Sequence, residues 1–243
     1  MIVQDLRQLG SLSMNSSQLP QGEEKTRAVR AMFDTIAGRY EFVNRLMTLG
    51  LDGRWRKMTV ENLHLPQGSK ILDVASGTGD FARELARQSH LALATDLSFG
   101  MLQAARSVPE RVQSDGSQLP FPSGSFDGVT CGYALRNFTD LQGTFNEMAR
   151  VIRPGGRLSI LEIAEPQSAL LRLGFNFWFR KFVPLLGSIL SDKAAYSYLP
   201  RSTAYLPDSD ELVRMLGRSG FSTVNHRYVM SGLSQQICAT RIG

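Results

Sequence analysis

The chain has 243 residues, of which 42% are hydrophobic and 20% charged, an ordinary composition for one folded domain with a sizeable α/β core. No run approaches the roughly 18 consecutive apolar residues of a membrane-spanning helix, and the net charge of +5 is too mild to require a nucleic-acid partner. Cys131 and Cys238 are too few for a disulfide framework and lie in apolar stretches. We therefore expect buried free thiols in a reducing cytoplasm.

The first segment differs in composition from the rest. Residues 1–22 are rich in Ser, Gln and Leu and lack the apolar core of a signal peptide, so we expect a disordered extension before a single domain over 23–243. Between 23 and 66, apolar residues recur every three or four positions, which predicts two or three helices. Tyr40 and other polar or aromatic residues fall on their inner face, so these helices either cover the sheet or form a lid.

A glycine turn follows these helices. A buried strand over 71–75 leads into Ser76-Gly77-Thr78-Gly79, and a helical pattern begins at Asp80. Glycines let the backbone approach a ligand closely, and the start of the helix offers unpaired N–H groups. The turn therefore predicts a site for a small, nucleoside-bearing ligand.

Acidic residues follow the next two predicted strands. Asp96 ends a strand over 91–95 and lies 17 residues after Gly79, where an acidic side chain often holds ribose hydroxyls. Asp115 and Gly116 follow a short strand over 111–113. Carboxyl ends of parallel strands lie at one edge of a sheet, so we expect both aspartates at the site. The alternatives are a solvated aspartate at a strand end and a turn aspartate before glycine.

The next strand, over 128–132, is followed by Arg136 and Asn137. These side chains can bind an oxygen-rich ligand, although Arg136 could instead pair with a surface carboxylate. The other predicted elements are a helix over 99–107, a helix over 141–152, a sharp turn at 153–156, a strand over 157–162 and a helix over 208–218. Predicted strands over 223–230 and 233–240 form a hairpin at one sheet edge.

An apolar and basic segment over 166–206 interrupts the alternation of strands and helices. Within residues 167–206 there are five basic residues and one acidic residue, so most of the net charge lies here. The segment is either a packed helix with solvated charges or a cover for an apolar substrate that also touches anionic lipid headgroups. The two readings are compatible.

Alternating strands and helices predict a doubly wound, Rossmann-like sheet. The spacing Gly77-x-Gly79-x-x-Ala82 fits nicotinamide dehydrogenases and methyltransferases alike. Asp73, inside the first strand, and Asp80 favour a ligand that carries positive charge and no phosphate. S-adenosylmethionine, with its ammonium and sulfonium groups, is such a ligand.

The segment from Leu72 to Asp80 resembles the first motif of class I S-adenosylmethionine-dependent methyltransferases. Further segments are similar to the C-methyltransferases of menaquinone and ubiquinone biosynthesis. They are Phe33-Asp34-x-x-Ala37-x-x-Tyr40-x-x-x-Asn44, Gly50 with Trp55-Arg56, Leu119-Pro-Phe121, Leu135-Arg136-Asn137, Arg153-Pro-Gly-Gly156 and Tyr196-x-Tyr198-Leu199-Pro200-x-Ser202. The resemblance covers residues 28–232 and implies a seven-stranded sheet with a reversed last strand.

The chain departs from that family at several positions. Glu41 stands where the family usually has Asp, and Gly132 where serine is common near the cofactor. Residues 163–166 and the ending over 234–241 also differ from the family pattern. These departures affect the acceptor more than the cofactor.

With S-adenosylmethionine as the cofactor, we expect contacts to each part of that molecule. Asp73, Gly77, Thr78 and Gly79 surround its amino-acid part, Asp96 holds the ribose, Asp115 and Gly116 lie beside the adenine, and Gly132 lies nearby. The resemblance implies transfer of a methyl group to a ring carbon of a reduced demethylated isoprenoid quinone, most simply demethylmenaquinol. Arg136 and Asn137 would stabilise the oxyanion, and Tyr40 and Asp115 would relay the proton through water.

Other functions stay open on the sequence alone. The acceptor could be a ubiquinone-type, phenolic or polyketide compound, the protein could be a nicotinamide oxidoreductase, or it could be a non-catalytic scaffold in quinone synthesis.

No histidine lies in a motif, so we expect neither a histidine base nor a metal. We expect a cytoplasmic enzyme that contacts the inner membrane face through 166–206, and a homodimer is an open alternative to a monomer.

Overall fold

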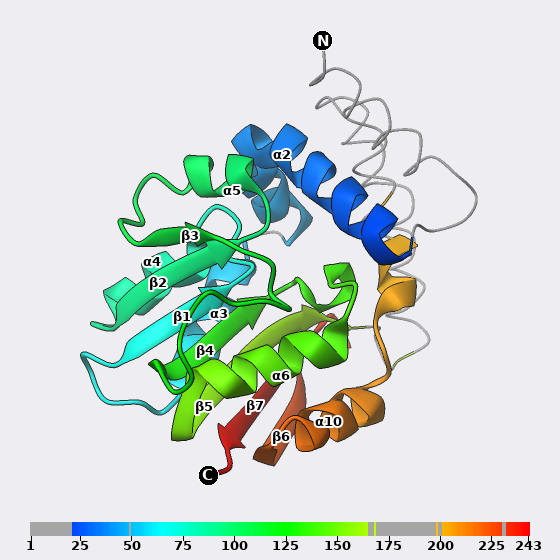
Figure 1. Ribbon diagram of the computed structural model, residues 1–243. Helices are drawn as coiled ribbons and strands as arrows, with labels where there is room; N and C mark the ends of the chain where they lie inside the picture. Colours follow the sequence, from blue (N-terminus) through cyan, green and yellow to red (C-terminus); the bar gives the residue numbers. More distant parts are fainter. Residues whose placement is uncertain (1–20, 49, 165–167, 169–197, 199–200, 230–231) are drawn as a thin grey trace.

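The computed structural model describes residues 21–48, 50–164, 168, 198, 201–229 and 232–243 (Figure 1). The helices are α2 (Gly22–Met47), α3 (Asp52–Glu61), α4 (Asp80–Arg87), α5 (Phe99–Ala104), α6 (Leu141–Val151) and α10 (Ser209–Arg218), with 3-10 turns η1 (Leu135–Asn137) and η3 (Thr203–Tyr205). The strands are β1 (Lys70–Val74), β2 (Leu91–Asp96), β3 (Arg111–Gln113), β4 (Phe126–Gly132), β5 (Ile152–Ile163), β6 (Phe221–Val229) and β7 (Ser234–Arg241).

The strands form one seven-stranded sheet in the order β3-β2-β1-β4-β5-β7-β6. Strands β1 to β5 pair in parallel, whereas β7 pairs antiparallel with both β5 and β6. The order reverses between β1 and β4, and in such sheets ligands bind outside the carboxyl ends of the strands at that point. This topology confirms the predicted doubly wound sheet with its reversed last strand.

Helices cover both faces of the sheet because successive residues of a buried strand point to opposite sides. In β1, Ile71 packs in a cluster with Trp55 of α3 and Phe81 of α4. Its neighbour Leu72 packs in the cluster that holds Phe145 of α6 and Leu212 of α10. Figure 1 shows α6 and α10 in front of the sheet, with α3 and α4 behind it. Within the described segments, no helix is long and apolar enough to cross a membrane.

Helix α2 does not belong to either layer. It runs across the end of the sheet and packs against α5 (Figure 1). Its apolar stripe, which includes Val29, Met32 and Ile36, forms a separate cluster with Met101 of α5 and with Tyr198. This position places one side of α2 over the carboxyl ends of β1 and β2.

The predicted elements differ from the observed ones in a few places. The helix expected over 99–107 ends at Ala104, because Ala105 leaves the helical conformation. The segment 153–156, predicted as a turn before the strand, lies inside β5. The pairing of β5 with β4 shifts register over this segment, from Phe126 opposite Ile152 to Gly128 opposite Arg157. Cys131 is buried as expected, whereas Cys238 is only half-buried.

Two predictions fall largely outside the described residues. They are the disordered extension over 1–22, of which only Gln21 and Gly22 are described, and the insertion over 166–206. Gly22 already belongs to α2, so the helix begins one residue earlier than expected.

Candidate active site

The turn after β1 combines several left-handed residues. Ala75, Gly77 and Gly79 have φ values of 54°, 57° and 86°, and Gly79 is the N-cap of α4. A Cβ atom at Gly79 would lie 2.6 Å from Cγ2 of Val108, so both conformation and space require glycine there. The turn therefore brings the backbone close to whatever lies above it and directs the first N–H groups of α4 into that space.

Three buried polar atoms in and below this turn have no hydrogen-bond partner among the described residues. They are Oδ2 of Asp73, Oγ of Ser76 and Oγ1 of Thr78. Asp73 is fully buried, and Thr130 Oγ1 donates to its other oxygen at 3.0 Å. Burial raises the pKa of Asp73 to about 8, against the lowering effect of the Thr130 hydrogen bond. Unpaired buried polar atoms are costly, so the turn is suited to a ligand with hydrogen-bonding groups and positive charge.

Asp96 is located at the end of β2, directly beside the glycine turn. Its Oδ2 accepts a hydrogen bond from the backbone N–H of Gly77, and Oδ1 accepts one from that of Ser98, both at 2.8 Å. Burial raises the pKa of Asp96 to about 6, although both hydrogen bonds lower it. Each carboxylate oxygen retains a second lone pair, so Asp96 can still accept hydrogen bonds from two adjacent hydroxyl groups.

Asp115 and Gly116 follow β3 and form a tight bend at the same edge. Oδ1 of Asp115 accepts hydrogen bonds from both the backbone N–H and the hydroxyl of Ser117, each at 2.8 Å. A Cβ at Gly116 would lie 2.8 Å from the ring of Phe138. The absence of a side chain at Gly116 thus lets the Phe138 ring pack closely against the bend.

One cleft unites most of the predicted site residues. Of the cofactor residues, Gly77, Asp96, Asp115, Gly116 and Gly132 line it, and so do Tyr40 and Asn137. Within the described part of the chain, Asp73, Thr78, Gly79 and Arg136 are not part of its lining. Asp73 lies below the turn in β1, Thr78 and Gly79 belong to the turn itself, and Arg136 pairs with Glu162 of β5.

Helix α2 forms a wall of this cleft. Val29, Phe33 and Tyr40 line it, and the ring of Tyr40 packs edge-on against Phe33 with centroids 5.9 Å apart. Burial raises the pKa of Tyr40, while the nearby positive charges of Arg136 and Arg56 oppose this effect. Helix α2 therefore takes part in the site.

Polar contacts fasten α2 to the rest of the domain. Asp34 Oδ1 accepts hydrogen bonds from the hydroxyl of Ser98 and the backbone N–H of Gly100 at the start of α5. Near the other end, Lys25 Nζ donates to the carbonyl of Phe138 at 2.8 Å. Both Ser98 and Phe138 also line the cleft, so these contacts hold α2 against its rim.

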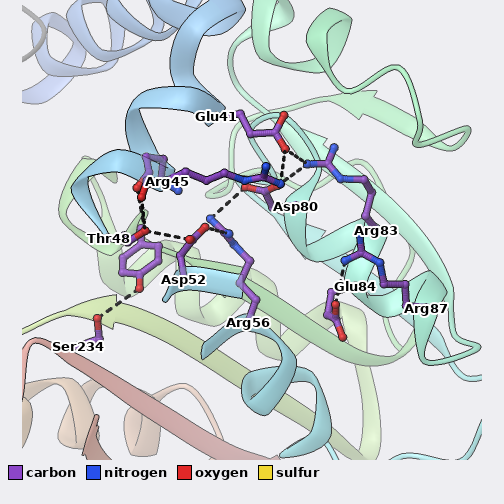
Figure 2. A network of polar contacts seen from close by, with 12 residues as sticks. Glu41, Arg45, Thr48, Asp52, Arg56, Asp80, Arg83, Glu84, Arg87 and Ser234 are labelled. Carbon is purple, nitrogen blue, oxygen red and sulfur yellow. Dashed lines mark hydrogen bonds and ion pairs between the residues drawn. The ribbon is translucent and has the colours of Figure 1, made fainter. Parts of the chain in front are cut away.

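Asp80, which the sequence indicated as favouring a cationic ligand, is engaged by two arginines and is not part of the cleft lining. Its carboxylate lies between the guanidinium groups of Arg56 and Arg83, and Arg83 also reaches Glu41 of α2 at 2.9 Å (Figure 2). Arg56 further pairs with Asp52. Both carboxylate oxygens of Asp80 are therefore engaged by arginines that also pair with Asp52 and Glu41. Its role is to link α2, α3 and α4.

Arg83 connects this network to the glycine turn. Its Nη1 donates to the carbonyl oxygen of Thr78 at 2.8 Å, while its Nη2 contacts Glu41 and Asp80. Glu41 follows Tyr40 directly in α2, and a Cβ at Gly77 would lie 3.9 Å from the Tyr40 ring. The network therefore sets the position of the α2 wall relative to the turn.

The strand end after β4 is the second half of the site. Tyr133 has a φ of 56°, and its hydroxyl lies 3.3 Å from Oγ of Ser234. A Cβ at Gly132 would lie only 2.2 Å from the ring of Phe81. Gly132 is therefore required by close packing against α4.

The turn η1 holds Arg136 and Asn137 in different environments. Arg136 is buried; its Nη1 donates to Glu162 and to the carbonyl of Tyr133, and its Nε donates to Ser202 Oγ at 3.2 Å. Asn137 lines the cleft, and its Oδ1 accepts a hydrogen bond from Tyr198 at 3.4 Å. Arg136 thus has a buried carboxylate partner, not the surface one considered from the sequence.

Sequence reasoning missed Glu162, Tyr133 and Ser98. A signal for Glu162 was present, since a carboxylate inside the apolar run Leu158–Ile163 is as unusual as Asp73 in β1. Tyr133 and Ser98 carry no comparable signal. Their importance depends on a left-handed backbone and on a helix N-cap, respectively.

Comparisons with known proteins agree with this geometry. The sequence matches the ubiE/COQ5 methyltransferase family over residues 21–243. It is 40% identical over 227 residues to a demethylmenaquinone methyltransferase of Roseiflexus castenholzii, covering 90% of this chain and 95% of the relative. It is 37% identical over 223 residues to the ubiquinone/menaquinone biosynthesis C-methyltransferase UbiE of Geobacter sulfurreducens, covering 87% of each chain.

A solved structure supports the fold. The protein is similar to an S-adenosylmethionine-dependent methyltransferase of Thermotoga maritima, with a TM-score of 0.64, 18% identity, and coverage of 88% of this chain and 99% of the other. The chain belongs to the ubiE/COQ5 methyltransferase family and is an enzyme that uses S-adenosylmethionine as its methyl donor.

Proposed function

We propose that this enzyme transfers the methyl group of S-adenosylmethionine to a ring carbon of a reduced demethylated isoprenoid quinone, with demethylmenaquinol as the favoured acceptor. The names of the similar proteins from Roseiflexus and Geobacter support a quinone-pathway acceptor. The observation that carries the proposal is that Tyr40 and Asn137 line the same cleft as Gly77 and Asp96. Groups suited to an acceptor oxygen and groups suited to the cofactor thus share one space.

The chemistry requires an ionised ring hydroxyl. Once that hydroxyl loses its proton, electron density reaches the ring carbon, which attacks the sulfonium methyl in line with the departing sulfur. The carbon–sulfur bond breaks, a carbon–carbon bond forms, and the cofactor leaves as neutral S-adenosylhomocysteine. The ring carbon then gives up its hydrogen as a proton, the oxygen regains one, and one proton is released overall.

Asn137 and Arg136 are the proposed oxyanion stabilisers. The hydrogen bond from Tyr198 to Oδ1 of Asn137 orients the amide, so its NH₂ group is directed away from Tyr198 and is available as a donor. Arg136 has Nε and Nη1 engaged by Ser202, Tyr133 and Glu162. Among the described residues, its Nη2 forms no hydrogen bond, so this arm is the one we assign to the acceptor oxygen.

Tyr40 and Asp115 are the proposed proton relay. Because burial raises its pKa, Tyr40 keeps its proton at neutral pH and acts first as a hydrogen-bond donor. Asp115 is the carboxylate in the cleft that we assign to accept the proton through water. This division of roles follows from the different environments of the two side chains.

On the cofactor side, Asp96 would accept both ribose hydroxyls, and Asp115 with Gly116 would lie beside the adenine. Gly77 leaves space for the cofactor at the turn, and Gly132 lines the cleft at the end of β4. Asp73 below the turn, and Thr78 and Gly79 within it, are assigned to the amino-acid part, where the unpaired oxygens of Asp73 and Thr78 favour the ammonium group.

A turnover assay with labelled S-adenosylmethionine tests the proposal. Demethylmenaquinol, a demethylated ubiquinol-type benzoquinol and a simple naphthol are offered separately, and product is identified by mass. We expect carbon methylation of demethylmenaquinol with the highest kcat/KM. A preference for another acceptor would reassign the substrate, and no turnover on any quinol would overturn the proposal.

Variants assign the roles within this reaction. Arg136→Ala and Asn137→Ala should retain S-adenosylhomocysteine affinity and lose about 100- to 1000-fold in kcat, the range for removal of an oxyanion donor. Full turnover in Arg136→Ala with normal cofactor binding would remove Arg136 from the chemistry.

We also propose that the cytoplasmic enzyme reaches its lipophilic acceptor at the inner membrane face through residues 166–206, whose basic and apolar composition suits anionic lipid. Replacing Arg180 and Lys181 with Ser should reduce co-sedimentation with anionic liposomes. Unchanged co-sedimentation would contradict this contact.

A second copy of the chain is a further proposed partner, to be tested by light scattering.

A further inference from the structure

Glu162, at the carboxyl end of β5, is a fully buried carboxylate that accepts three hydrogen bonds. Its Oε2 accepts from the backbone N–H of Leu135 at 2.7 Å. Its Oε1 accepts from the backbone N–H of Ile163 at 2.8 Å and from Nη1 of Arg136. One side chain therefore holds the first residue of η1, the guanidinium group of η1 and its own strand together.

The contacts of Glu162 indicate that it has a role other than stabilising the fold. A buried ion pair contributes little to folding compared with a well-packed apolar pair, because both charges lose their hydration. Here the carboxylate holds the backbone N–H of Leu135 and the side chain of Arg136, and Asn137 of the same turn lines the cleft. Arg136 is left with Nη2 as its unengaged arm among the described residues.

We propose that Glu162 is a positioning residue for methyl transfer, which fixes η1 so that Arg136 and Asn137 meet the acceptor oxygen together and balances the charge of Arg136. This inference rests on the proposed acceptor role of these two residues. Glu162 acts through them and does not touch the acceptor.

The charge of Glu162 has a measurable effect on the acceptor. With Glu162 ionised, the Arg136–Glu162 pair is neutral overall, whereas loss of the carboxylate leaves an uncompensated guanidinium beside the acceptor oxygen. An added positive charge favours the ionised hydroxyl, so the acid limb of the kcat profile should move to lower pH.

Neighbouring titratable groups do not obscure this effect. Tyr133 and Cys131 lie within the electrostatic range of Glu162, and Tyr198 and Tyr40 within that of Arg136. Burial raises the pKa of each of these four groups, so all of them are neutral in the range of the assay. Asp96 and Asp73, with pKa values of about 6 and 8, titrate in this range in every variant. A difference in the limb between Glu162→Gln and the wild type therefore reports the charge of Glu162.

The test compares Glu162→Gln, Glu162→Asp and the control Glu147→Gln. Glu147 is a close match, because it also accepts a backbone N–H, that of Leu119, and pairs with an arginine, Arg150, away from the cleft. Each variant is checked for folding by circular dichroism and for S-adenosylhomocysteine affinity by calorimetry. The pH dependence of kcat is then measured with the quinol that the wild-type enzyme methylates.

We expect Glu162→Gln to lose about 10-fold or more in kcat with cofactor affinity unchanged, and its acid limb to move down by about one pH unit. Glu162→Asp keeps the charge and shortens the reach, so it should lose rate without moving the limb and should serve if the glutamine variant fails to fold. Glu147→Gln should leave both quantities unchanged. An unshifted limb in Glu162→Gln, full activity in it, or full activity in Glu162→Asp would overturn the inference. A wild-type enzyme that methylates no quinol would overturn the proposed function first and this inference with it.

Discussion

Thr130 and Asp73 are register partners on the neighbouring strands β4 and β1, and Oγ1 of Thr130 donates to Oδ1 of Asp73 at 3.0 Å. The second oxygen of Asp73 has no partner among the described residues, and the pKa of this fully buried group rises to about 8. At neutral pH and without cofactor, Asp73 is thus mostly protonated. A cation placed above it would favour the ionised form.

Cofactor binding should therefore release a proton. The positive groups of S-adenosylmethionine lower the pKa of Asp73, so at pH 7 a bound proton leaves as the complex forms. Calorimetry in two buffers of different ionisation enthalpy measures this release. Asp73→Asn should abolish this release, whereas Asp127→Asn, near the amino end of β4 and outside the cleft lining, should not. Equal release in wild type and Asp73→Asn would contradict the assignment.

The stability of the cofactor-free enzyme should fall as pH rises. Asp73 has a pKa of about 8 when folded and 3.8 as its ordinary value, so the folded state holds a proton that the unfolded state has lost. This contribution is complete below about pH 4 and is lost as the pH rises through about 8. Urea unfolding at pH 5, 6, 7 and 8 measures the slope. Asp73→Asn should reduce it, and an identical slope in that variant would exclude Asp73 as its source.

Asp96→Asn should weaken cofactor binding. The amide would present an NH₂ group where both carboxylate oxygens now accept hydrogen bonds, from Gly77 and Ser98. Losing a charged acceptor costs about 1.5–3 kcal/mol, or roughly 10- to 150-fold in affinity. For the wild type, affinity should also decline below about pH 6, where Asp96 becomes protonated. Asp140→Asn is the control, because Asp140 also accepts a backbone N–H but caps α6. Unchanged affinity in Asp96→Asn would refute the ribose assignment.

Gly132→Ser should destabilise this enzyme, although serine is common at the corresponding position of the family. The new Cβ would lie 2.2 Å from the Phe81 ring, and overpacking of this kind costs about 1–3 kcal/mol. Thermal unfolding measures the loss. The double variant Gly132→Ser with Phe81→Leu should recover much of it, and a double variant no more stable than Gly132→Ser would show that Phe81 is not the obstacle.

Glu41→Ala should loosen the α2 wall. Glu41 and Arg83 are partly exposed, and such a pair contributes about 0.2–1 kcal/mol, so cofactor affinity should fall by up to about fivefold. Amide hydrogen exchange around Tyr40 should accelerate. Glu61→Ala, which breaks an exposed pair with Lys57 in α3, is the matched control and should change neither.

The sequence predicted the parts of the site that topology determines. Parallel strands buried on both faces appear as continuous apolar runs, and β1 and β2 are of this kind. Asp96 and Asp115 could be assigned because the carboxyl ends of such strands always gather at one edge. Both residues line the cleft at that edge.

The sequence did not predict pairings between elements. Asp80 looked available to a cation because its partners, Arg56 and Arg83, become neighbours only when α3 packs on α4. Arg136 looked ready for a ligand or a surface carboxylate, whereas its partner Glu162 lies on β5, brought near by the β4–β5 pairing. Side-chain periodicity indicates which face of a helix or strand a residue occupies. It does not indicate which charged residue of another element will lie opposite that face.

Helix α2 has a thermodynamic consequence for how the two substrates are taken up. Its Tyr40 faces the space proposed for the acceptor, and the same helix is attached to the glycine turn through Glu41 and Arg83. A molecule that restricts the motion of this wall when it binds lowers the entropic cost for the second molecule. By linkage, any gain in quinol affinity from the cofactor equals the gain in cofactor affinity from the quinol.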